Sequence, residues 1–148
     1  RIPYTESTYP QLFEMSDGTI YCFYRRKTHR GNWSCITTMD NGETWSKEKD
    51  ILDGKSPPGN GWYASFAKDP RKDHLHLLFL WHASKDDLPH SRRNLYYMQM
   101  KHTTGKWTGI ENDTLKTPIS FQEANENYPF EISKAKRIFL VICRRRKF

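Results

Sequence analysis

The stretch Thr38-Met39-Asp40-Asn41-Gly42-Glu43-Thr44-Trp45 decides how the surrounding chain folds. It places an aspartate two residues before a glycine, between segments of β-forming residues. An aspartate side chain accepts hydrogen bonds from the backbone amides of its own turn. A glycine takes a positive φ without a Cβ clash. We therefore expect a hairpin turn at 40–42, held by Asp40 and Gly42, with Trp45 anchoring the hairpin in an apolar core.

Strand signals dominate the rest of the chain. Short segments rich in aromatic and β-branched residues alternate with turns that contain glycine, asparagine or aspartate. The first set of strands is expected at 9–13, 19–24 and 32–38, with a fourth strand that starts at 44. After a glycine- and proline-rich connection, the second set is expected at 62–67, 74–81, 94–101 and 106–108. A third set opens at 128–130 and continues at 137–143, and 110–115 could hold one helical turn at most.

The order of an aromatic opening, a turn and an apolar second strand recurs, which is typical of β-propeller blades. We predict an all-β fold of about two and a half four-stranded antiparallel blades, in one partial domain over 1–148. The expected bounds are about 7–53 for the first blade, 62–110 for the second and 127–143 for the start of the third. Because a closed propeller has at least about four blades, we expect the chain to be a fragment. A β-sandwich is the alternative for the same strand pattern.

Composition and charge narrow the possible partners. No apolar run approaches the roughly 20 residues of a membrane helix, so no membrane span is predicted. The net charge is +7, and the tail Arg144-Arg145-Arg146-Lys147 supplies four of these charges, which leaves +3. Nucleic-acid binding needs a basic face rather than a tail, so we expect no nucleic-acid partner. A second basic group either attracts a polyanion such as an acidic polysaccharide or is a solvated loop; it comprises Arg25, Arg26, Lys27, His29 and Arg30.

The stretch at 38–45 matches the Asp-box pattern, Ser/Thr-x-Asp-x-Gly-x-Thr-Trp. Its five defined positions are Thr38, Asp40, Gly42, Thr44 and Trp45. Beyond the box, the chain resembles the BNR-repeat (bacterial neuraminidase repeat) family of sialidase-like β-propellers over most of 7–142. The likeness is carried by the segments 9–13, 17–21, 23–25, 63–66, 74–76, 81–82 and 94–97. Thr104-Gly105-Lys106-Trp107 takes the place of the box in the second unit, without its aspartate, and is interpreted as a degenerate box.

The resemblance implies a carbohydrate-active or carbohydrate-binding propeller, since related propellers include sialidases and polysaccharide lyases of uronate-containing glycans. Our first hypothesis is degradation of an acidic, uronate-containing polysaccharide by a lyase-like or glycosidase-like reaction, which would place the protein outside the cell or in a periplasm. The alternatives are a non-catalytic glycan-binding or surface module, a scaffold for protein partners, and a sialidase. Arg1-Ile2-Pro3 is similar to the sialidase Arg-Ile-Pro motif, but Tyr9-Pro10 occupies the position where that motif belongs.

A lyase needs one group that neutralises the uronate carboxylate, a base that removes the C5 proton and an acid for the leaving oxygen. His29 and His82 each follow the second strand of their unit, so both should face the same end of the propeller. The resemblance to lyase-type propellers, which use His and Tyr at the mouth, makes His82, His29 and Tyr63 the candidate catalytic residues. Each of these side chains also has a structural interpretation, as a loop, strand-end or packing residue.

Arginine binds carboxylates through two parallel hydrogen bonds, so Arg25 is the candidate carboxylate clamp, with an intrablade salt bridge as the alternative. Aromatic faces stack on sugar rings, and the candidate platforms for substrate binding are Trp33, Trp81 and Tyr9. His74 and His76 share a face of one strand, but their spacing is not diagnostic of a metal site. We therefore expect no metal and no cofactor. The redox state of Cys22, Cys35 and Cys143 is left open by the sequence.

Overall fold

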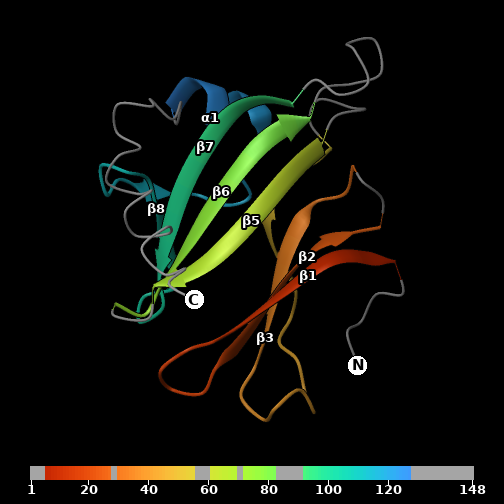
Figure 1. Cartoon of the computed structure of the whole chain (residues 1–148), viewed down its shortest axis with the longest axis vertical. Helices are drawn as coiled ribbons and strands as arrows, with labels where there is room; N and C mark the ends of the chain where they lie inside the picture. The colour runs from red at the N-terminus through yellow and green to blue at the C-terminus, as the bar shows by residue number, and fades with distance from the viewer. Residues whose placement is uncertain (1–5, 28–29, 56–60, 70–71, 83–91, 128–148) are drawn as a thin grey trace, which may run out of the picture.

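The computed structural model describes residues 6–27, 30–55, 61–69, 72–82 and 92–127. Within these residues the chain forms two antiparallel sheets and one short helix, as Figure 1 shows. His29, Cys143 and the expected third set of strands lie outside the described residues. No helix in the described part is long enough and apolar enough to cross a membrane.

The first sheet is a meander of four strands in the order β1-β2-β3-β4. Its strands are β1 (Ser7–Glu14), β2 (Ile20–Arg26), β3 (Trp33–Thr38) and β4 (Lys49–Leu52). Because successive side chains of a strand point to opposite faces, Phe23 packs on the face toward the second sheet, while Cys22 and Tyr24 pack on the far face.

The second sheet has five strands in the order β5-β6-β7-β8-β9. They are β5 (Gly61–Asp69), β6 (His74–His82), β7 (Arg92–Lys101), β8 (Lys106–Thr108) and β9 (Thr114–Leu115), followed by the helix α1 (Phe121–Asn127). In β6 buried residues alternate with half-buried ones along the whole strand. This alternation is what a strand with one core-facing side requires.

The core lies between the facing sides of the two sheets. The rings of Phe23 in β2 and Phe66 in β5 stack with centroids 4.0 Å apart. At the other end of the second sheet, Phe121 of α1 stacks on Trp81 with centroids 4.2 Å apart. A parallel bridge between Leu52 and Ile119 joins the end of the first sheet to the segment before α1. The two sheets therefore share one apolar core.

The all-β prediction of four-stranded antiparallel units is confirmed, with three local corrections. The fourth strand begins at Lys49 rather than at Thr44, because the hydrogen bonds of the 38–45 turn engage Thr44. Strand β9 and helix α1 were not predicted. The helix begins after a capping box, in which the Ser120 backbone N–H and hydroxyl both donate to Glu123 Oε2 at 2.9 and 2.8 Å. The blade bounds remain predictions.

Candidate substrate site

The Gln11 side chain joins β1 and β5, which are edge strands of the two sheets, and takes the place of a neighbouring strand. Gln11 Oε1 accepts a hydrogen bond from the Phe66 backbone N–H at 2.9 Å, and Gln11 Nε2 donates to the Ala64 carbonyl at 3.3 Å. This bridge satisfies two backbone groups at the edge of β5. It also brings Tyr9 of β1 beside Tyr63 of β5, with ring centroids 6.4 Å apart at an interplanar angle of 61°.

Tyr9 sits in an irregular stretch of β1. The register of β1 against β2 shifts between Thr8 and Gln11, and Tyr9 has a φ of 56°. A large non-glycine residue rarely adopts a positive φ, and such strain gathers at functional sites. Pro10 fits the same irregularity, since proline within a sheet is confined to edges and bulges. The bulge leaves the Tyr9 ring 53% exposed beside the core.

Arg25 is a buried cation at the centre of this group. Its side chain is 3% exposed, and its guanidinium lies over the Tyr9 ring at 4.8 Å and over the Tyr63 ring at 5.4 Å from the centroids. Nε donates to Thr8 Oγ1 at 3.3 Å, while Nη1 is buried and has no hydrogen-bond partner among the described residues. Burying a charge without a counter-charge is costly. The described residues supply no counter-charge for Arg25.

His82 completes the group from the last position of β6. Its ring meets Tyr63 edge to face, with centroids 5.5 Å apart and an interplanar angle of 80°. Tyr63 thus contacts both the cationic Arg25 and the imidazole of His82. The Tyr63 phenol, the His82 imidazole and the Arg25 guanidinium supply proton donors, a proton acceptor and a fixed positive charge. Tyr9, Arg25, Tyr63 and His82 are called the Arg25 cluster below.

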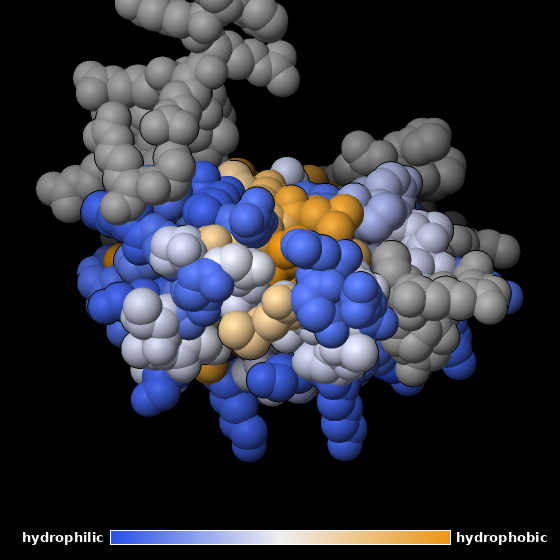
Figure 2. All heavy atoms as spheres, turned by 90° about the horizontal axis from the view of Figure 1, so that it is seen from below, coloured by the Kyte–Doolittle hydropathy of each residue, from blue (hydrophilic) through white to orange (hydrophobic). Residues whose placement is uncertain are grey.

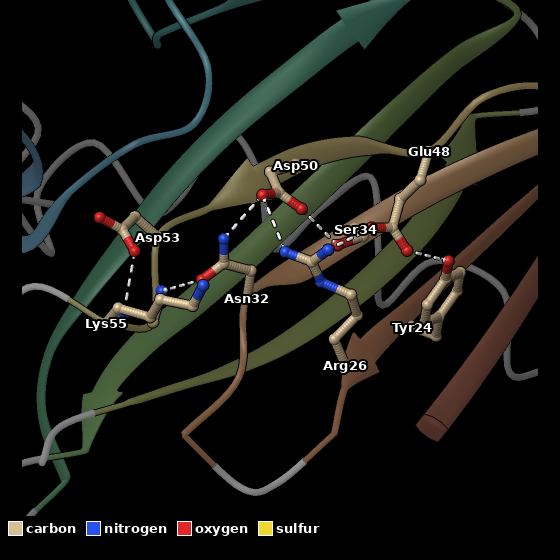
Figure 3. Close-up of polar contacts among 9 residues, drawn as sticks. Tyr24, Arg26, Asn32, Ser34, Glu48, Asp50, Asp53 and Lys55 are labelled. Atoms are coloured by element: carbon tan, nitrogen blue, oxygen red, sulfur yellow. Dashed lines mark hydrogen bonds and ion pairs between the residues drawn. The ribbon is translucent and has the colours of Figure 1, made fainter. Parts of the chain in front are cut away.

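The next residue of β2, Arg26, points to the far face of the first sheet and is fully engaged there (Figure 3). Arg26 Nη1 contacts Glu48 Oε1 at 2.5 Å, and Nη2 contacts Asp50 Oδ2 at 3.1 Å. Asp50 also accepts hydrogen bonds from Asn32 Nδ2 and Ser34 Oγ, both at 2.7 Å. The Tyr24 hydroxyl donates to Glu48. These contacts hold the end of β2 in place on the far face of the first sheet.

The segment between β2 and β3 is anchored by the same residues. The Arg26 backbone N–H donates to the Asn32 carbonyl at 2.9 Å, and Asn32 Oδ1 accepts from the Gly54 N–H at 3.1 Å. A Cβ atom at Gly54 would lie 2.4 Å from the Gly31 carbonyl oxygen, so only glycine fits this approach. These contacts therefore fix the end of β2 that carries Arg25, together with the start of β3.

The Asp-box turn lies at the opposite end of the first sheet, since Thr38 pairs with Ile20 whereas Trp33 pairs with Arg25. Asp40 accepts from the Thr44 backbone N–H at 2.9 Å and from the Thr38 hydroxyl at 2.6 Å. Gly42 has a φ of 94°. Trp45 packs on the far-face cluster of Cys22, Tyr24 and Ile36. This geometry is structural, and the box does not reach the Arg25 cluster.

Two of the expected sugar platforms are corrected by the structure. Trp33 and Trp81 are only 1% and 4% exposed, because both rings pack in the core. The Trp33 indole donates to the Trp62 carbonyl at 3.0 Å and stacks on Tyr9 with centroids 6.4 Å apart. Trp33 therefore supports Tyr9 from below and offers no free face. Of the three expected platforms, Tyr9 has an exposed ring.

His74 and His76 lie on β6 away from the Arg25 cluster. His76 Nδ1 lies 2.8 Å from the Tyr97 hydroxyl, and burial raises the pKa of Tyr97 to about 12. Burial also lowers the pKa values of His74 and His76. In the described ranges no group of three His, Cys, Asp or Glu side chains is placed to hold a metal ion. Cys22 and Cys35 are buried free thiols.

Sequence reasoning missed Gln11 and Thr8, the residues that position the Arg25 cluster. Both flank the Tyr9-Pro10 pair, and a proline inside a strand pattern is a signal for a bulge. The same signal indicates that the residues beside it leave the regular ladder. It could not show that Gln11 reaches β5, because that contact joins residues 53 and 55 positions apart.

Comparison with known proteins places the chain in a family. The sequence model of the BNR repeat-containing family matches residues 3–139. The chain belongs to this family. An ulvan lyase of Nonlabens ulvanivorans is 30% identical over 131 residues, which are 80% of this chain and 28% of that protein. An ulvan lyase of Pseudoalteromonas sp. (strain PLSV) is 28% identical over 80% of this chain and 27% of its own length.

Solved structures agree with this assignment. An ulvan lyase described as a new family of polysaccharide lyase superposes with a TM-score of 0.74 and 26% identity, covering 83% of this chain and 30% of that one. The same kind of enzyme is also known bound to -[GlcA(1-4)Rha3S]-. A Hadza microbial sialidase has a TM-score of 0.56 at 14% identity over 71% of this chain, and shares the fold alone. The chain thus spans less than a third of the length of these relatives.

Proposed function

We propose that the protein containing this chain is a polysaccharide lyase that cleaves an acidic, uronate-containing polysaccharide. The observation that carries the proposal is the buried Arg25, whose Nη1 has no partner among the described residues and which lies between Tyr9 and Tyr63. Relatives of this chain are ulvan lyases, and one is known with a GlcA-containing ligand. A glucuronate carboxylate is an anion of the kind that the Arg25 cluster lacks.

The reaction is a β-elimination at the uronate. Arg25 pairs with the carboxylate and stabilises the negative charge that develops there as the C5 proton leaves. A base accepts that proton, the C4–O bond breaks, a C4=C5 double bond forms, and an acid protonates the departing oxygen. Tyr63 is assigned as acid because its ring lies 5.4 Å from the Arg25 guanidinium, and His82 is assigned as base because its ring meets Tyr63 edge to face. His29 stays a candidate for the base from its place in the sequence.

Tyr9 is assigned to sugar binding. Its ring is half exposed, is backed by Trp33 and lies under the Arg25 guanidinium. An aromatic ring of this kind presents apolar area at little entropic cost, while its hydroxyl stays available for a polar contact. Tyr9 would pack on the uronate or the neighbouring sugar while Arg25 holds the carboxylate. The strained φ of Tyr9 fixes the ring in that position.

The test is absorbance of the new C4=C5 double bond when the complete protein is incubated with uronate polysaccharides, ulvan first. His82→Ala should remove turnover, since it deletes the proposed base. His74→Ala is the matched control, because His74 lies at the other end of the same strand and should keep the activity. Both variants are checked by circular dichroism for an intact fold.

Absence of the double-bond absorbance with every uronate polysaccharide would end the lyase proposal. Binding of the glycan without turnover would instead support the second candidate, a non-catalytic glycan-binding module. That candidate also draws on the unpaired Arg25 Nη1 and the exposed Tyr9 ring. Full activity of His82→Ala would contradict the role given to His82.

A further inference from the structure

The proposed site is divided between the two sheets. Tyr9 and Arg25, assigned to sugar and carboxylate binding, belong to the first sheet and form its binding half. Tyr63 and His82, assigned to proton transfer, belong to the second sheet and form the proton-transfer half. Because β1 and β5 are edge strands of separate sheets, no ladder of strand hydrogen bonds pairs them. The alignment of the two halves therefore depends on side chains that reach from one sheet to the other.

Trp33 of β3 holds the backbone just before Tyr63. The Trp33 indole Nε1 donates to the Trp62 carbonyl at 3.0 Å, and the Trp33 side chain is buried. A buried hydrogen bond is electrostatically stronger than one in water. Trp33 also stacks on Tyr9, so it contacts the binding half directly and the proton-transfer half through the backbone of β5.

Gln11 of β1 holds the backbone just after Tyr63. Gln11 Nε2 donates to the Ala64 carbonyl at 3.3 Å, and Gln11 Oε1 accepts from the Phe66 N–H at 2.9 Å. The bonded groups of Trp62, Ala64 and Phe66 belong to alternate residues, so they lie along the same edge of β5. On that edge, Tyr63 is therefore held on one side by a side chain from β3 and on the other by a side chain from β1.

Other contacts between the two sheets lie at the end opposite the Arg25 cluster. Ser16, in the turn between β1 and β2, donates to the Asp73 carboxylate from its backbone N–H at 3.1 Å and from its hydroxyl at 2.9 Å. The Tyr21 hydroxyl lies 3.2 Å from His102 Nδ1. Figure 2, which views the molecule from below, shows apolar surface at this end surrounded by polar residues. These hydrogen bonds join the same two sheets without involving a residue of the Arg25 cluster.

We propose that Gln11 is a positioning residue for proton transfer. By holding Ala64 and Phe66 it keeps Tyr63 aligned with a substrate that is bound to the first sheet. This inference rests on the proposed function, which assigns Tyr63 as the acid.

The binding half is held by contacts within the first sheet. Arg25 Nε donates to Thr8 Oγ1 at 3.3 Å, and the Tyr9 ring is backed by Trp33. Loss of the Gln11 side chain should therefore displace the acid and leave the carboxylate clamp in place. Loss of the Thr8 hydroxyl should do the reverse, because it frees the guanidinium without touching β5.

The first experiment measures kcat and KM of the complete protein on ulvan. Gln11→Met keeps the length of the side chain and removes both hydrogen bonds; it should lower kcat about tenfold or more, since a 1 Å misplacement can cost about 10²-fold. Its KM should stay within about twofold of the wild-type value, because uniform substrate binding is kept. Thr8→Val should instead raise KM about threefold or more. Ser16→Ala, which removes a hydrogen bond between the same sheets at the opposite end, is the matched control and should change neither constant.

The second experiment observes the position of Tyr63 without turnover. In protein with 13C-labelled tyrosine rings, the Tyr63 signals are assigned from their loss in Tyr63→Phe. These signals should shift in Gln11→Met and stay in place in Ser16→Ala. Gln11→Asn, which keeps a neutral amide and is one CH₂ shorter, serves as the second variant if Gln11→Met does not fold, and the same shift is expected.

Unchanged Tyr63 ring signals in a folded Gln11 variant would overturn the proposal. A raised KM with unchanged kcat, or an equal fall in kcat for Gln11→Met and Ser16→Ala, would overturn it as well, since Gln11 would then be a general contact between the sheets. If the wild type turned over no uronate polysaccharide, the lyase proposal would fail, and the ring signals would still decide whether Gln11 positions Tyr63. Turnover that is unaffected in Gln11→Met would keep the lyase function and refute the positioning role.

Discussion

Arg25 and Arg26 are neighbours in β2, yet their surroundings differ in almost every respect. Arg26 contacts two carboxylates, Glu48 and Asp50, on the far face of the first sheet. Arg25 is more deeply buried, lies between two tyrosine rings, and forms no ion pair with a described residue. The alternation of side chains along a strand places them on opposite faces. The comparison separates an arginine that holds the fold from one that we propose binds the substrate carboxylate.

The difference between the two arginines originates in β4. Asp50 in β4 and Glu48 just before it lie on the Arg26 side, and both carboxylates contact Arg26. Among the described residues no carboxylate forms an ion pair with Arg25, whose Nε donates to the neutral Thr8 hydroxyl. A buried charge that has its counter-charges and hydrogen bonds contributes to the stability of the fold. A buried charge without them destabilises the fold, because its lost hydration is not compensated, and an anionic ligand can supply that compensation.

Arg25→Met should produce the largest change in activity. It separates a role in substrate binding from a role in the stability of the fold most sharply. Loss of a fixed positive charge at the substrate carboxylate should lower kcat/KM on a uronate polysaccharide by about 10²–10³-fold. Because the variant replaces a buried, unpaired charge by an apolar side chain, its stability should stay equal or rise. Absorbance kinetics and urea unfolding of the complete protein measure the two quantities.

Arg25→Lys keeps the charge and loses the planar fork, so its activity should fall between those of the wild type and Arg25→Met. If Arg25→Met kept full activity and lost stability, Arg25 would be a structural arginine like its neighbour, and the comparison would fail.

The sequence predicted the parts of the fold that depend on local patterns. Alternation and turn residues located eight of the nine strands, and the spacing of Asp40 and Gly42 located the tight turn. The start of the fourth strand was wrong, because the Asp40 carboxylate engages Thr44 and delays pairing until Lys49. Helix α1 was missed although Ser120 and Glu123 have the spacing of a capping box, because the helix has only seven residues.

The candidate site was predictable only in part, because it joins two sheets. Matched positions after second strands suggested that Arg25 and His82 share one end, and both contact Tyr63 in the structure. Residue type alone could not show that Trp33 and Trp81 are buried while Tyr9 is exposed. That outcome depends on the bulge at Tyr9 and on packing by Phe66 and Phe121, which lie far away in the sequence.

Arg26→Met should show the opposite pattern from Arg25→Met. Removing Arg26 leaves Glu48 and Asp50 without their cation, and their side chains are only 13% and 27% exposed. We expect a loss of about 1–3 kcal/mol in the free energy of unfolding, with kcat/KM changed only a few-fold. Lys27→Met, at the exposed next position, is the matched control. A stable but inactive Arg26→Met protein would assign Arg26 to the substrate rather than to the fold.

Ser34→Ala tests whether the support behind Arg26 is a connected network. Ser34 is fully buried, and its hydroxyl donates to Asp50 Oδ1 at 2.7 Å. Losing this donor should cost about 1 kcal/mol of stability, measured by urea unfolding. In the Arg26→Met background the cost should change, because both residues bind the same carboxylate. Strict additivity of the two losses would show that Arg26 and Ser34 act independently.

Asp17→Asn should have the smallest effect on the free energy of unfolding. It tests whether the large loss expected for Arg26→Met comes from the burial of the carboxylates that Arg26 contacts. Hydrogen bonds from the Thr19 backbone N–H and from His102 hold the pKa of Asp17 at about 2, below its ordinary value of 3.8. A depressed carboxyl pKa adds stability that is present above the ordinary value and is lost as the pH falls through about 2.

The Asp17 side chain is half exposed, so solvent weakens its contacts. Asp17→Asn should therefore leave the free energy of unfolding almost unchanged at pH 7 and make its decline between about pH 4 and pH 2 less steep. The exposed variant Glu43→Gln is the control. A destabilisation at pH 7 as large as that of Arg26→Met would show that exposure does not decide which of these carboxylate contacts supports the fold.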